Sequence, residues 1–531
     1  MRLPRATYFG RVNAWIRLYK TKNWFWMFPP LIASIAISLI YLLTHPYPAF
    51  SGGLFLHSGE IILQNNYILP STIPYFANGT VPFAYPPLGF YVVAVLRDLG
   101  FGHITITRFV PAILTVLYII PAFYLGRDLL GGRIYGSVFA FIIAISPEIL
   151  LFTLPAGGIV RAWAMLFTLI GLNAGLRLFR DGGQKWLVLG GLMFGLTLMT
   201  HPVFAAFYGV SYILFMINLR RTSKGLLLGI GSAGIGFLIA SPWWLLVVSR
   251  HGFEVYLLGS SSQAGLFNLR MAVGRMFVLY ADKTATQLAT IWNVLLPIGL
   301  FYSVVKREWL ISTWFGGIAI VVTTAPAVWV FLIGAASTTL LLVDGTKSVI
   351  EEATETVSGY SVVHGALVLS ILLYATFATA LFAGSYPVPP GQENTLYMEI
   401  EDDDMTAYEW IRSSTDPNSD FVGVGEELEW VPLFAQRDIV SGPWGAEWLQ
   451  EDRRTQYISI YNSMLSCQTA SCVQSQVARV ESQPEYLYLG DSKISEDRFL
   501  LLSQELDSSS CFERSFSDGH AIIYRIDSEC H

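Results

Sequence analysis

A single carboxylate stands out in the long segment that follows the first apolar run of the chain. The segment from His45 to Tyr91 contains no Lys or Arg, and Glu60 is its only acid. His57, Glu60 and Gln64 are spaced at i, i+3 and i+7, which places them on one stripe of a helix whose other positions are apolar. The pattern predicts a helix on the membrane surface with its polar stripe exposed. Glu60 is then either an ordinary solvated acid or a catalytic base.

Several cations are predicted to share the membrane face of Glu60, and together they describe a pocket for an anion. They are Arg161, His201, Arg250, His251, Arg270, Arg275 and Lys283. Arg161 and Arg250 have a simpler explanation: each stands at the end of a predicted span, where arginine side chains commonly reach out to the membrane–water interface. His201 precedes a proline between two closely spaced spans, and a structural role is its alternative.

The elements that must position these residues are membrane spans. The chain has 531 residues, of which 53% are hydrophobic and 14% charged, and apolar runs of about 20 residues recur from Phe25 to near Leu381. The first run is predicted to remain as an anchor, since no clear cleavage pattern follows it. Eleven spans are predicted, at 25–43, 106–126, 134–151, 160–178, 186–200, 203–218, 226–248, 286–304, 309–325, 327–343 and 364–384.

The distribution of basic residues predicts the orientation of these spans. Six Lys and Arg precede the first span, which places the N-terminus in the cytoplasm. With eleven spans, 17 Lys and Arg fall on the cytoplasmic side and seven in exterior loops. Residues 45–105 then form a large first external loop with interfacial helices, and the C-terminal tail is extracellular. The segment "PPLGFYVVAVLRDLG" is one of those interfacial helices, because counting it as a span would invert every later loop.

A second domain is predicted from residue 385 to residue 531, after a membrane domain of residues 1–384. The tail holds 27 of the 39 Asp and Glu but 9 of the 33 Lys and Arg, for a net charge of −18, which argues against a nucleic-acid partner. It also contains all four cysteines, Cys467, Cys472, Cys511 and Cys530. They are disulfide candidates in an oxidising exterior, and a four-cysteine zinc site is the alternative, though their spacing matches one poorly.

Several stretches resemble a known class of membrane enzymes. "FAYPPLGFY", "RFVPAILTVLYIIPAFYLGRDLLGGR", "ISPEILLFTLPAGGIVRA" and the tail segment "MTAYEWIRSSTDPNSDFVGVGEELEW" resemble the GT-C class of integral membrane glycosyltransferases. That class includes the catalytic subunit of oligosaccharyltransferase, and the most distinctive stretches are similar to largely uncharacterised archaeal and bacterial members. The resemblance implies a polytopic α-helical membrane domain followed by an extracellular α/β domain.

The resemblance also implies an activity and roles for the residues. A sugar would pass from a polyprenyl (dolichyl) phosphate or diphosphate donor to a glycan or protein acceptor at the external face of the cell membrane, with inversion. Glu60 would be the first-loop acid that acts as base or metal ligand. The residues assigned to the donor phosphate are Arg161, Arg250, His251 and Arg275, and the supporting residues are His57, Glu148, His201 and Lys283.

This chain departs from the class at three places. The usual first-loop Asp-x-Asp or Asp-Glu is absent, the second loop "FTLPAGG" has no acid, and "GEELEW" replaces the Trp-Trp-Asp-Tyr-Gly signature of oligosaccharyltransferase. These departures argue against transfer to Asn sequons and weaken the expectation of a bound Mg²⁺ or Mn²⁺, which needs several oxygen ligands. A non-catalytic relative that binds lipid-linked sugar or acts as a scaffold, and a lipid or solute transporter or flippase, are the alternative functions.

Overall fold

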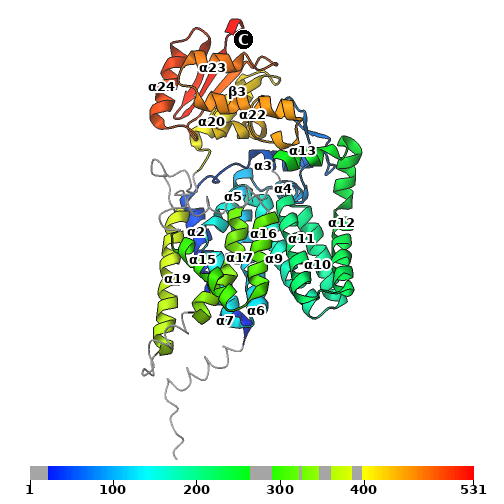
Figure 1. The fold of residues 1–531 in the computed structure, drawn as a ribbon. Coiled ribbons are helices and arrows are strands. Elements are labelled where there is room, and N and C mark those ends of the chain that lie inside the picture. The colour runs from blue at the N-terminus through cyan, green and yellow to red at the C-terminus, as the bar shows by residue number, and fades with distance from the viewer. Residues whose placement is uncertain (1–21, 263–289, 322–325, 346–359, 385–397, 531) are drawn as a thin grey trace, which may run out of the picture.

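The structure, a computed structural model, describes residues 22–262, 290–321, 326–345, 360–384 and 398–530. A bundle of long helices carries a smaller domain of mixed strands and helices at one end, and the C-terminus lies at the far tip of that domain (Figure 1). The first-loop helices α3 and α4 and the short helix α13 lie between the bundle and the tail domain.

The apolar runs form helices because a helix satisfies its own backbone hydrogen bonds, which lipid cannot do. The N-terminal half contains α2 Asn23–Thr44, α3 Gly53–Gln64, α4 Leu88–Asp98, α5 His103–Leu117, α6 Ile119–Leu130, α7 Arg133–Ala144, α8 Pro147–Thr153 and α9 Gly158–Arg180. The rest of the bundle contains α10 Gln184–Leu198, α11 Pro202–Leu219, α12 Ser223–His251, α13 Glu254–Ser262, α15 Thr290–Val305, α16 Trp309–Val321, α17 Pro326–Leu340, the π-helical turn η1 Leu341–Gly345 and α19 Tyr360–Gly384.

Six helical segments of the described chain are long and apolar enough to cross a membrane. They are Asn23–Thr44, His103–Leu130, Gly158–Arg180, Pro202–Leu219, Ser223–His251 and Gly365–Gly384, and the bent pair α7 and α8 forms a seventh if it is one span. Shorter apolar helices cover Val294–Val305, Trp309–Ala319 and Phe331–Gly345. The chain is thus a polytopic helical membrane protein, while eleven spans stay a prediction. Parts of the predicted spans 286–304 and 309–325 lie outside the described residues.

The bend between α7 and α8 has a local cause. The two helices meet at 61°, and Pro147 occupies the first turn of α8. A proline has no backbone N–H to donate to the preceding turn, so α7 cannot continue through it. The predicted span 134–151 is therefore a broken helix.

The tail folds as an α/β unit around a five-stranded sheet with the strand order β4-β3-β5-β7-β6. The strands are β3 Asp420–Val424, β4 Asp438–Ile439, β5 Tyr486–Leu489, β6 Phe512–Asp518 and β7 Ala521–Ile526. β3 pairs in parallel with β4 and β5, whereas β7 is antiparallel to both β5 and β6. The other elements are α20 Asp402–Ser414, η2 Glu426–Trp430, α21 Val431–Phe434, η3 Ala446–Trp448, α22 Glu451–Ser466, α23 Ala470–Val477, α24 Glu496–Asp507 and η4 Ser528–Cys530.

Two disulfides close loops within the tail domain. Cys467 is joined to Cys472, and Cys511 is joined to Cys530. All four cysteines are paired in this way, so the structure favours the disulfide interpretation over a zinc site.

The first loop docks onto the tail through main-chain hydrogen bonds at the edge of the sheet. The proline-rich stretch forms a short hairpin of β1 Thr72–Ile73 and β2 Val81–Pro82. Between these strands, the Ala77 N–H donates to the Ile439 carbonyl at 2.9 Å, and the Ile439 N–H donates to the Tyr75 carbonyl at 3.1 Å. β4 is the edge strand of the sheet, so the loop covers an edge that would otherwise expose unpaired backbone groups.

A buried carboxylate of the tail, Glu429, holds the N-terminus of α3. Its Oε1 accepts from the Leu54 N–H at 2.8 Å, and its Oε2 accepts from the Gly52 N–H at 3.1 Å and from the Ser51 hydroxyl. A carboxylate at this position satisfies N–H groups that have no partner inside the helix and interacts favourably with the helix dipole. The contact explains what part of "GEELEW" does in this chain: it binds the tail to the first loop.

Gly53 makes this close approach possible, and substituting it should weaken the docking. A Cβ at Gly53 would lie 2.6 Å from the carbonyl oxygen of Glu429, a backbone atom that cannot move aside alone. We expect Gly53→Ala to destabilise the docked state by about 1–3 kcal/mol and to increase hydrogen exchange at α3 and η2.

Gly209→Ala is the matched control. Gly209 lies within α11, and no atom lies within 4 Å of the position that its Cβ would occupy, so this change should be neutral or slightly stabilising. Equal effects of the two substitutions would contradict the role given to Gly53.

Candidate functional site

A cavity of about 820 Å³ lies where the bundle, the first loop and the tail meet. Its walls are mainly apolar and aromatic, and its ionisable side chains come from different segments. The lining residues that matter to the chemistry are Tyr85 from the first loop, Arg161 from α9, His201 before α11, Tyr256 from α13 and Glu447 from η3. This composition, apolar with a few convergent polar groups, is typical of a small-molecule site.

Arg161 is the cation of this cavity, and it makes no hydrogen bond or ion pair within the described chain. Its Nε is buried without a hydrogen-bond partner. The guanidinium carbon lies 4.5 Å from the centre of the Phe152 ring, a cation–π contact. A charged group among apolar walls is costly unless an anion pairs with it. Arg161 therefore lies where it could bind an anion, and that role stays a prediction.

Glu447 is the acid of the same cavity, and it belongs to the tail domain. Burial raises the pKa of Glu447 above the ordinary carboxyl value. Tyr85 lines the same cavity as Glu447 and Arg161, and burial is the main reason that the pKa of its phenol is raised. Gly259 allows α13 to pack tightly over this corner, because a Cβ there would lie 2.5 Å from the Trp448 ring.

His201 contributes a neutral, aromatic surface. Burial, with a further contribution from the charge of Arg161, lowers the pKa of His201 to about 3. Its ring centre lies 6.2 Å from those of Tyr85 and Phe152 and 5.3 Å from that of Phe204. The Nδ1 atom is buried without a hydrogen-bond partner. His201 therefore lines the cavity and can act there as an uncharged hydrogen-bonding group, while its supporting role stays a prediction.

Glu60 is placed differently from the expectation, because it is already paired with two basic groups. Its Oε2 lies 3.0 Å from Arg97 Nε and 3.0 Å from His103 Nε2, and its Oε1 accepts from Gln64 at 3.3 Å. Glu60 is not among the described residues that line the cavity. The idea of an unpaired acid surrounded by phosphate-binding cations is thus wrong, since the groups in contact with Glu60 are the Arg97 guanidinium and the His103 imidazole. Its role as a base stays a prediction.

The predicted polar stripe of α3 is not exposed as a whole. His57 is buried, and its Nε2 lies 3.0 Å from the carbonyl oxygen of Pro74. Burial lowers the pKa of His57 to about 4. The stripe was predicted to face solvent because the sequence does not show that the proline-rich wall folds back over His57. This residue holds that wall in place.

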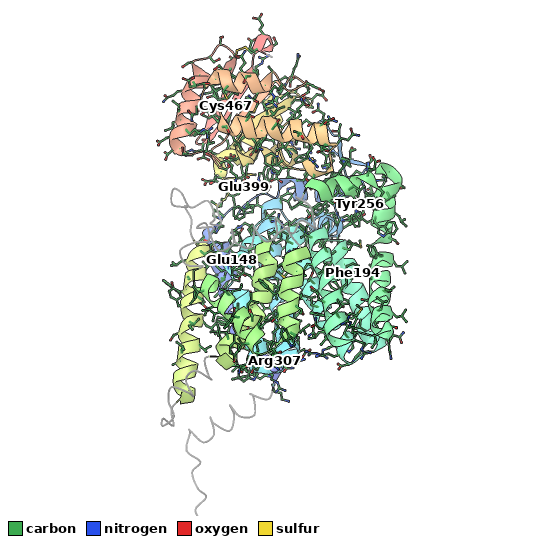
Figure 2. The ribbon with its side chains drawn as sticks, viewed as in Figure 1. Glu148, Phe194, Tyr256, Arg307, Glu399 and Cys467 are labelled. Carbon is green, nitrogen blue, oxygen red and sulfur yellow. A yellow bond between two sulfur atoms is a disulfide. The ribbon has the colours of Figure 1, made fainter. Side chains whose placement is uncertain are left out.

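Two other predicted residues sit apart from the cavity lining. Arg250 Nη1 donates to the carbonyl oxygens of Leu69 and Pro70, both at 2.8 Å, so this arginine fastens the first loop to α12. Glu148 lies in the first turn of α8 and accepts from the Ser146 hydroxyl at 3.3 Å. Figure 2 shows Glu148 on the α19 side of the bundle, away from Tyr256.

The remaining predicted residues do not complete the site. His251, at the end of α12, has a buried Nε2 without a hydrogen-bond partner, but it is not among the described cavity residues. Arg275 and Lys283, like Arg270, lie outside the described residues. The described residues bring together no group of three His, Cys, Asp or Glu that could hold a metal. Glu447 alone in the cavity, and Glu60 in its ion pairs, do not fit Mg²⁺ or Mn²⁺.

The comparison with solved structures identifies the fold. ArnT from Cupriavidus metallidurans bound to undecaprenyl phosphate is 14% identical with a TM-score of 0.55, and the match covers 94% of this chain and 98% of that one. Apo ArnT matches at 14% identity and a TM-score of 0.53, over 98% of this chain and 99% of that one. The arabinofuranosyltransferase AftD from Mycobacteria matches at 14% and 0.51, over 94% of this chain and 40% of that one. The chain shares their fold.

This likeness shows the fold alone, and membership of the GT-C class stays a prediction. At 14% identity it leaves the substrate to be argued from the site, and the closer resemblance to oligosaccharyltransferase stays a prediction. No protein-family model matches the chain, and no curated protein matches it.

The sequence prediction missed Glu447 and Tyr85. The stretch "GPWGAEWLQ" carries the only signal for Glu447: an acid between two tryptophans, which is unusual for a solvated surface. In the first loop, Tyr85 belongs to "FAYPP", a motif that the sequence analysis quoted without giving the phenol a role. Neither could be placed beside Arg161, because Tyr85 lies 76 residues before it in the chain and Glu447 lies 286 residues after it.

Glu60 should stabilise the first loop in a pH-dependent way. Its hydrogen bond with His103, and then that with Arg97, lowers the pKa of Glu60 to about 2. Because this folded-state pKa lies below the unfolded value of about 4.3, the stabilisation is complete above about pH 5 and disappears as pH falls toward 2. We expect Glu60→Gln to lower the free energy of unfolding by about 1–2 kcal/mol at pH 7. Thermal unfolding from pH 7 to 3 should show the two proteins converging, and a constant difference would contradict the ion-pair explanation.

Arg161 should discriminate phosphate from alcohol on a polyprenyl chain. We expect Arg161→Gln to weaken binding of a polyprenyl phosphate by about 10- to 100-fold, because one or two charge-assisted hydrogen bonds to the phosphate are lost. Binding of the matching polyprenol, which has no phosphate, should change little. Lipid-dependent thermal shifts in detergent measure both. Arg250→Gln is the comparison, and it should lower stability yet keep the preference for phosphate. Equal loss of that preference in both variants would contradict the assignment to Arg161.

Proposed function

We propose that this protein transfers a sugar from a polyprenyl-phosphate donor to a hydroxyl acceptor at the membrane surface beneath the tail domain. The observation that carries the proposal is Arg161, a cation that makes no hydrogen bond or ion pair with the described residues and that lines a large apolar cavity together with the acid Glu447. A phosphate on a long hydrocarbon chain matches both the charge and the walls. The fold shared with ArnT, whose structure contains undecaprenyl phosphate, supports this donor class.

The shape of the cavity suits the hydrocarbon part of such a donor. Along α12 the lining runs from Val248 to Phe237, a stretch of twelve residues that spans about 16 Å of helix. That distance is about half of the hydrocarbon thickness of a bilayer, about 30 Å. The cavity therefore extends from the tail domain well into the membrane, where isoprenoid units can lie among Phe237, Trp244 and Val203.

Arg161 would act at the leaving group. When the bond between the anomeric carbon and the phosphate oxygen breaks, its electron pair stays on the phosphate, whose negative charge grows. A guanidinium held in place before the reaction stabilises that charge without reorganisation of solvent. The phenol of Tyr85 and the neutral imidazole of His201 lie beside it and would orient the phosphate or the sugar.

A carboxylate would act on the acceptor. The acceptor oxygen forms the new bond to the anomeric carbon on the face opposite the phosphate, which inverts that centre, and its proton passes to the base. We propose Glu447 for this role because it lines the cavity with Arg161. Burial raises its pKa, which makes it a better proton acceptor than an exposed carboxylate. Glu60 is the base predicted from sequence, and its pairing with Arg97 and His103 makes it a weaker one.

Substitution of the two acids separates these assignments. We expect Glu447→Gln to reduce turnover of a polyprenyl-phosphate sugar by about 10²- to 10⁴-fold without changing donor binding. Glu60→Gln should reduce turnover less than tenfold at 25 °C, in line with a loss of stability. The rate of the unmodified protein should rise with pH through a value above the ordinary carboxyl pKa, because Glu447 must be deprotonated.

Three results would count against this account. A full loss of turnover in Glu60→Gln with stable, donor-binding protein would return the role of base to Glu60. Turnover retained by both variants would remove both acids. Donor binding without turnover for every polyprenyl-linked sugar tried would favour the non-catalytic relative, and movement of the lipid across vesicles without sugar transfer would favour the flippase.

A further inference from the structure

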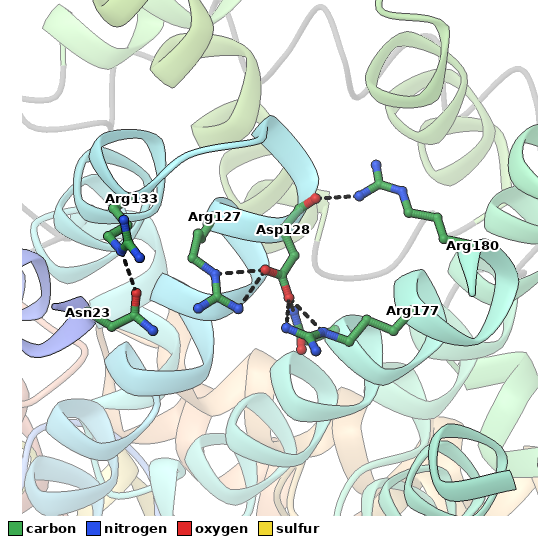
Figure 3. A network of polar contacts seen from close by, with 7 residues as sticks. Asn23, Arg127, Asp128, Arg133, Arg177 and Arg180 are labelled. Carbon is green, nitrogen blue, oxygen red and sulfur yellow. Dashed lines mark hydrogen bonds and ion pairs between the residues drawn. The ribbon is translucent and has the colours of Figure 1, made fainter. Parts of the chain in front are cut away.

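We propose a second anion-binding site, at the opposite end of the bundle from the tail, that holds the headgroup of an anionic phospholipid. A pocket of about 600 Å³ lies there, where α6 ends, α7 begins and α9 ends (Figure 3). Its lining contains four arginines and two aspartates: Arg127, Arg133, Arg177 and Arg180, with Asp128 and Asp181. The pocket therefore carries two more positive than negative charges.

Asp128 neutralises part of this charge and fixes the geometry. Its Oδ1 accepts from Arg127 Nε at 2.7 Å, and its Oδ2 accepts from Arg177 at 2.5 and 2.7 Å and from Asn173 at 3.0 Å. Two guanidinium groups share one carboxylate, so a net positive charge remains. Arg177 also stacks on Trp186, 4.8 Å from the ring centre, which limits its freedom to turn away.

Among the described residues, the other two arginines have only neutral hydrogen-bond partners. Arg133 Nε donates to the Asn23 side chain at 2.9 Å, and Arg180 Nη1 donates to the backbone carbonyl of Asp128. Figure 3 shows both guanidinium groups beside the Asp128 network. Each retains a full charge and further N–H groups, which fit phosphate oxygens in a forked geometry.

The N-terminus of α7 adds to this positive field. Its N-cap residue is Gly132, whose position carries no side-chain cap. Gly131, Gly132 and Arg133 all line the pocket. The first N–H groups of a helix and its dipole favour an anion, so the backbone and the arginines act on the same space.

Aromatic residues show that the pocket lies at headgroup depth. Asn23, which lines the pocket, is the first residue of α2. Trp24, the next residue, exposes 49% of its surface, and Phe28, about one turn further along α2, exposes 55%. Exposed aromatic residues at the start of a span mark the membrane–water interface. The phosphate of a lipid in that leaflet lies at the same depth, whereas a soluble anion would have no reason to prefer it.

The test uses the full-length protein in detergent with added phosphatidylglycerol or phosphatidylcholine, measured by native mass spectrometry. We expect phosphatidylglycerol to bind preferentially. Because one arginine near a membrane surface is worth about fivefold in affinity, the double variant Arg133→Gln, Arg180→Gln should bind it about 30-fold more weakly. Neither arginine pairs with a carboxylate, so folding should be retained. Arg133→Lys with Arg180→Lys keeps the charge and should keep most of the binding.

The control removes two charges from exposed positions that do not line the pocket, as Arg221→Gln with Lys224→Gln. This variant should bind phosphatidylglycerol like the unmodified protein. An equal loss in control and test variants would show a general charge effect and overturn the site. No preference over phosphatidylcholine would overturn it too, as would equal thermal stabilisation by inorganic phosphate, which would indicate an adventitious ion only. Sugar transfer is not measured, so the result is independent of the proposed function.

Discussion

The arrangement of this protein depends on the guanidinium of Arg161, which lies in an apolar cavity and makes no hydrogen bond or ion pair with the described residues. A cation in such a place is destabilising by itself, and the cation–π contact with Phe152 offsets a small part of that cost. A ligand that brings a negative charge restores the balance. The walls of the cavity are mainly apolar and continue along α12 toward the middle of the bilayer. A ligand that fits them must therefore also be largely hydrocarbon. On the proposed function, charge and shape together would select a lipid phosphate.

The tail domain completes this cavity rather than only covering it. Glu429 holds the N-terminus of α3, and β4 is joined to the first loop by backbone hydrogen bonds. This docking fixes the position of η3, which carries Glu447 and Trp448 into the cavity. On the proposed assignment, the reacting groups would come from two parts of the chain: the bundle would supply the cation, and the tail would supply an acid. A change that loosens the contact between them should affect the chemistry without touching a cavity residue.

The sequence predicts the elements well and their contacts less well. Long apolar runs and the break in composition at residue 385 are properties of single segments, so the helical bundle and the separate acidic tail can be inferred from them. Arg161 was also singled out, because a cation next to an apolar run is visible locally. Glu60 could not be judged in the same way. Its partners Arg97 and His103 lie 37 and 43 residues away, on helices whose packing against α3 no local pattern reveals.

Arg161 and Arg250, which were both predicted to bind the donor phosphate, also show that contacts are hard to predict from local sequence. Arg161 and Arg250 both stand at the ends of long helices, yet one faces the cavity and the other donates to the carbonyls of Leu69 and Pro70. Which cation is free depends on how the irregular first loop folds over the bundle. Its path is set by contacts with the tail, for example between Ala77 and Ile439, and these are properties of the assembled chain.

The most direct measurement is an experimental structure of the full-length protein with an added polyprenyl phosphate. The account predicts density for the phosphate within hydrogen-bond distance of the Arg161 guanidinium, with the hydrocarbon chain descending along α12 toward Phe237. A phosphate bound elsewhere, with the Arg161 side chain left without an anion, would contradict it.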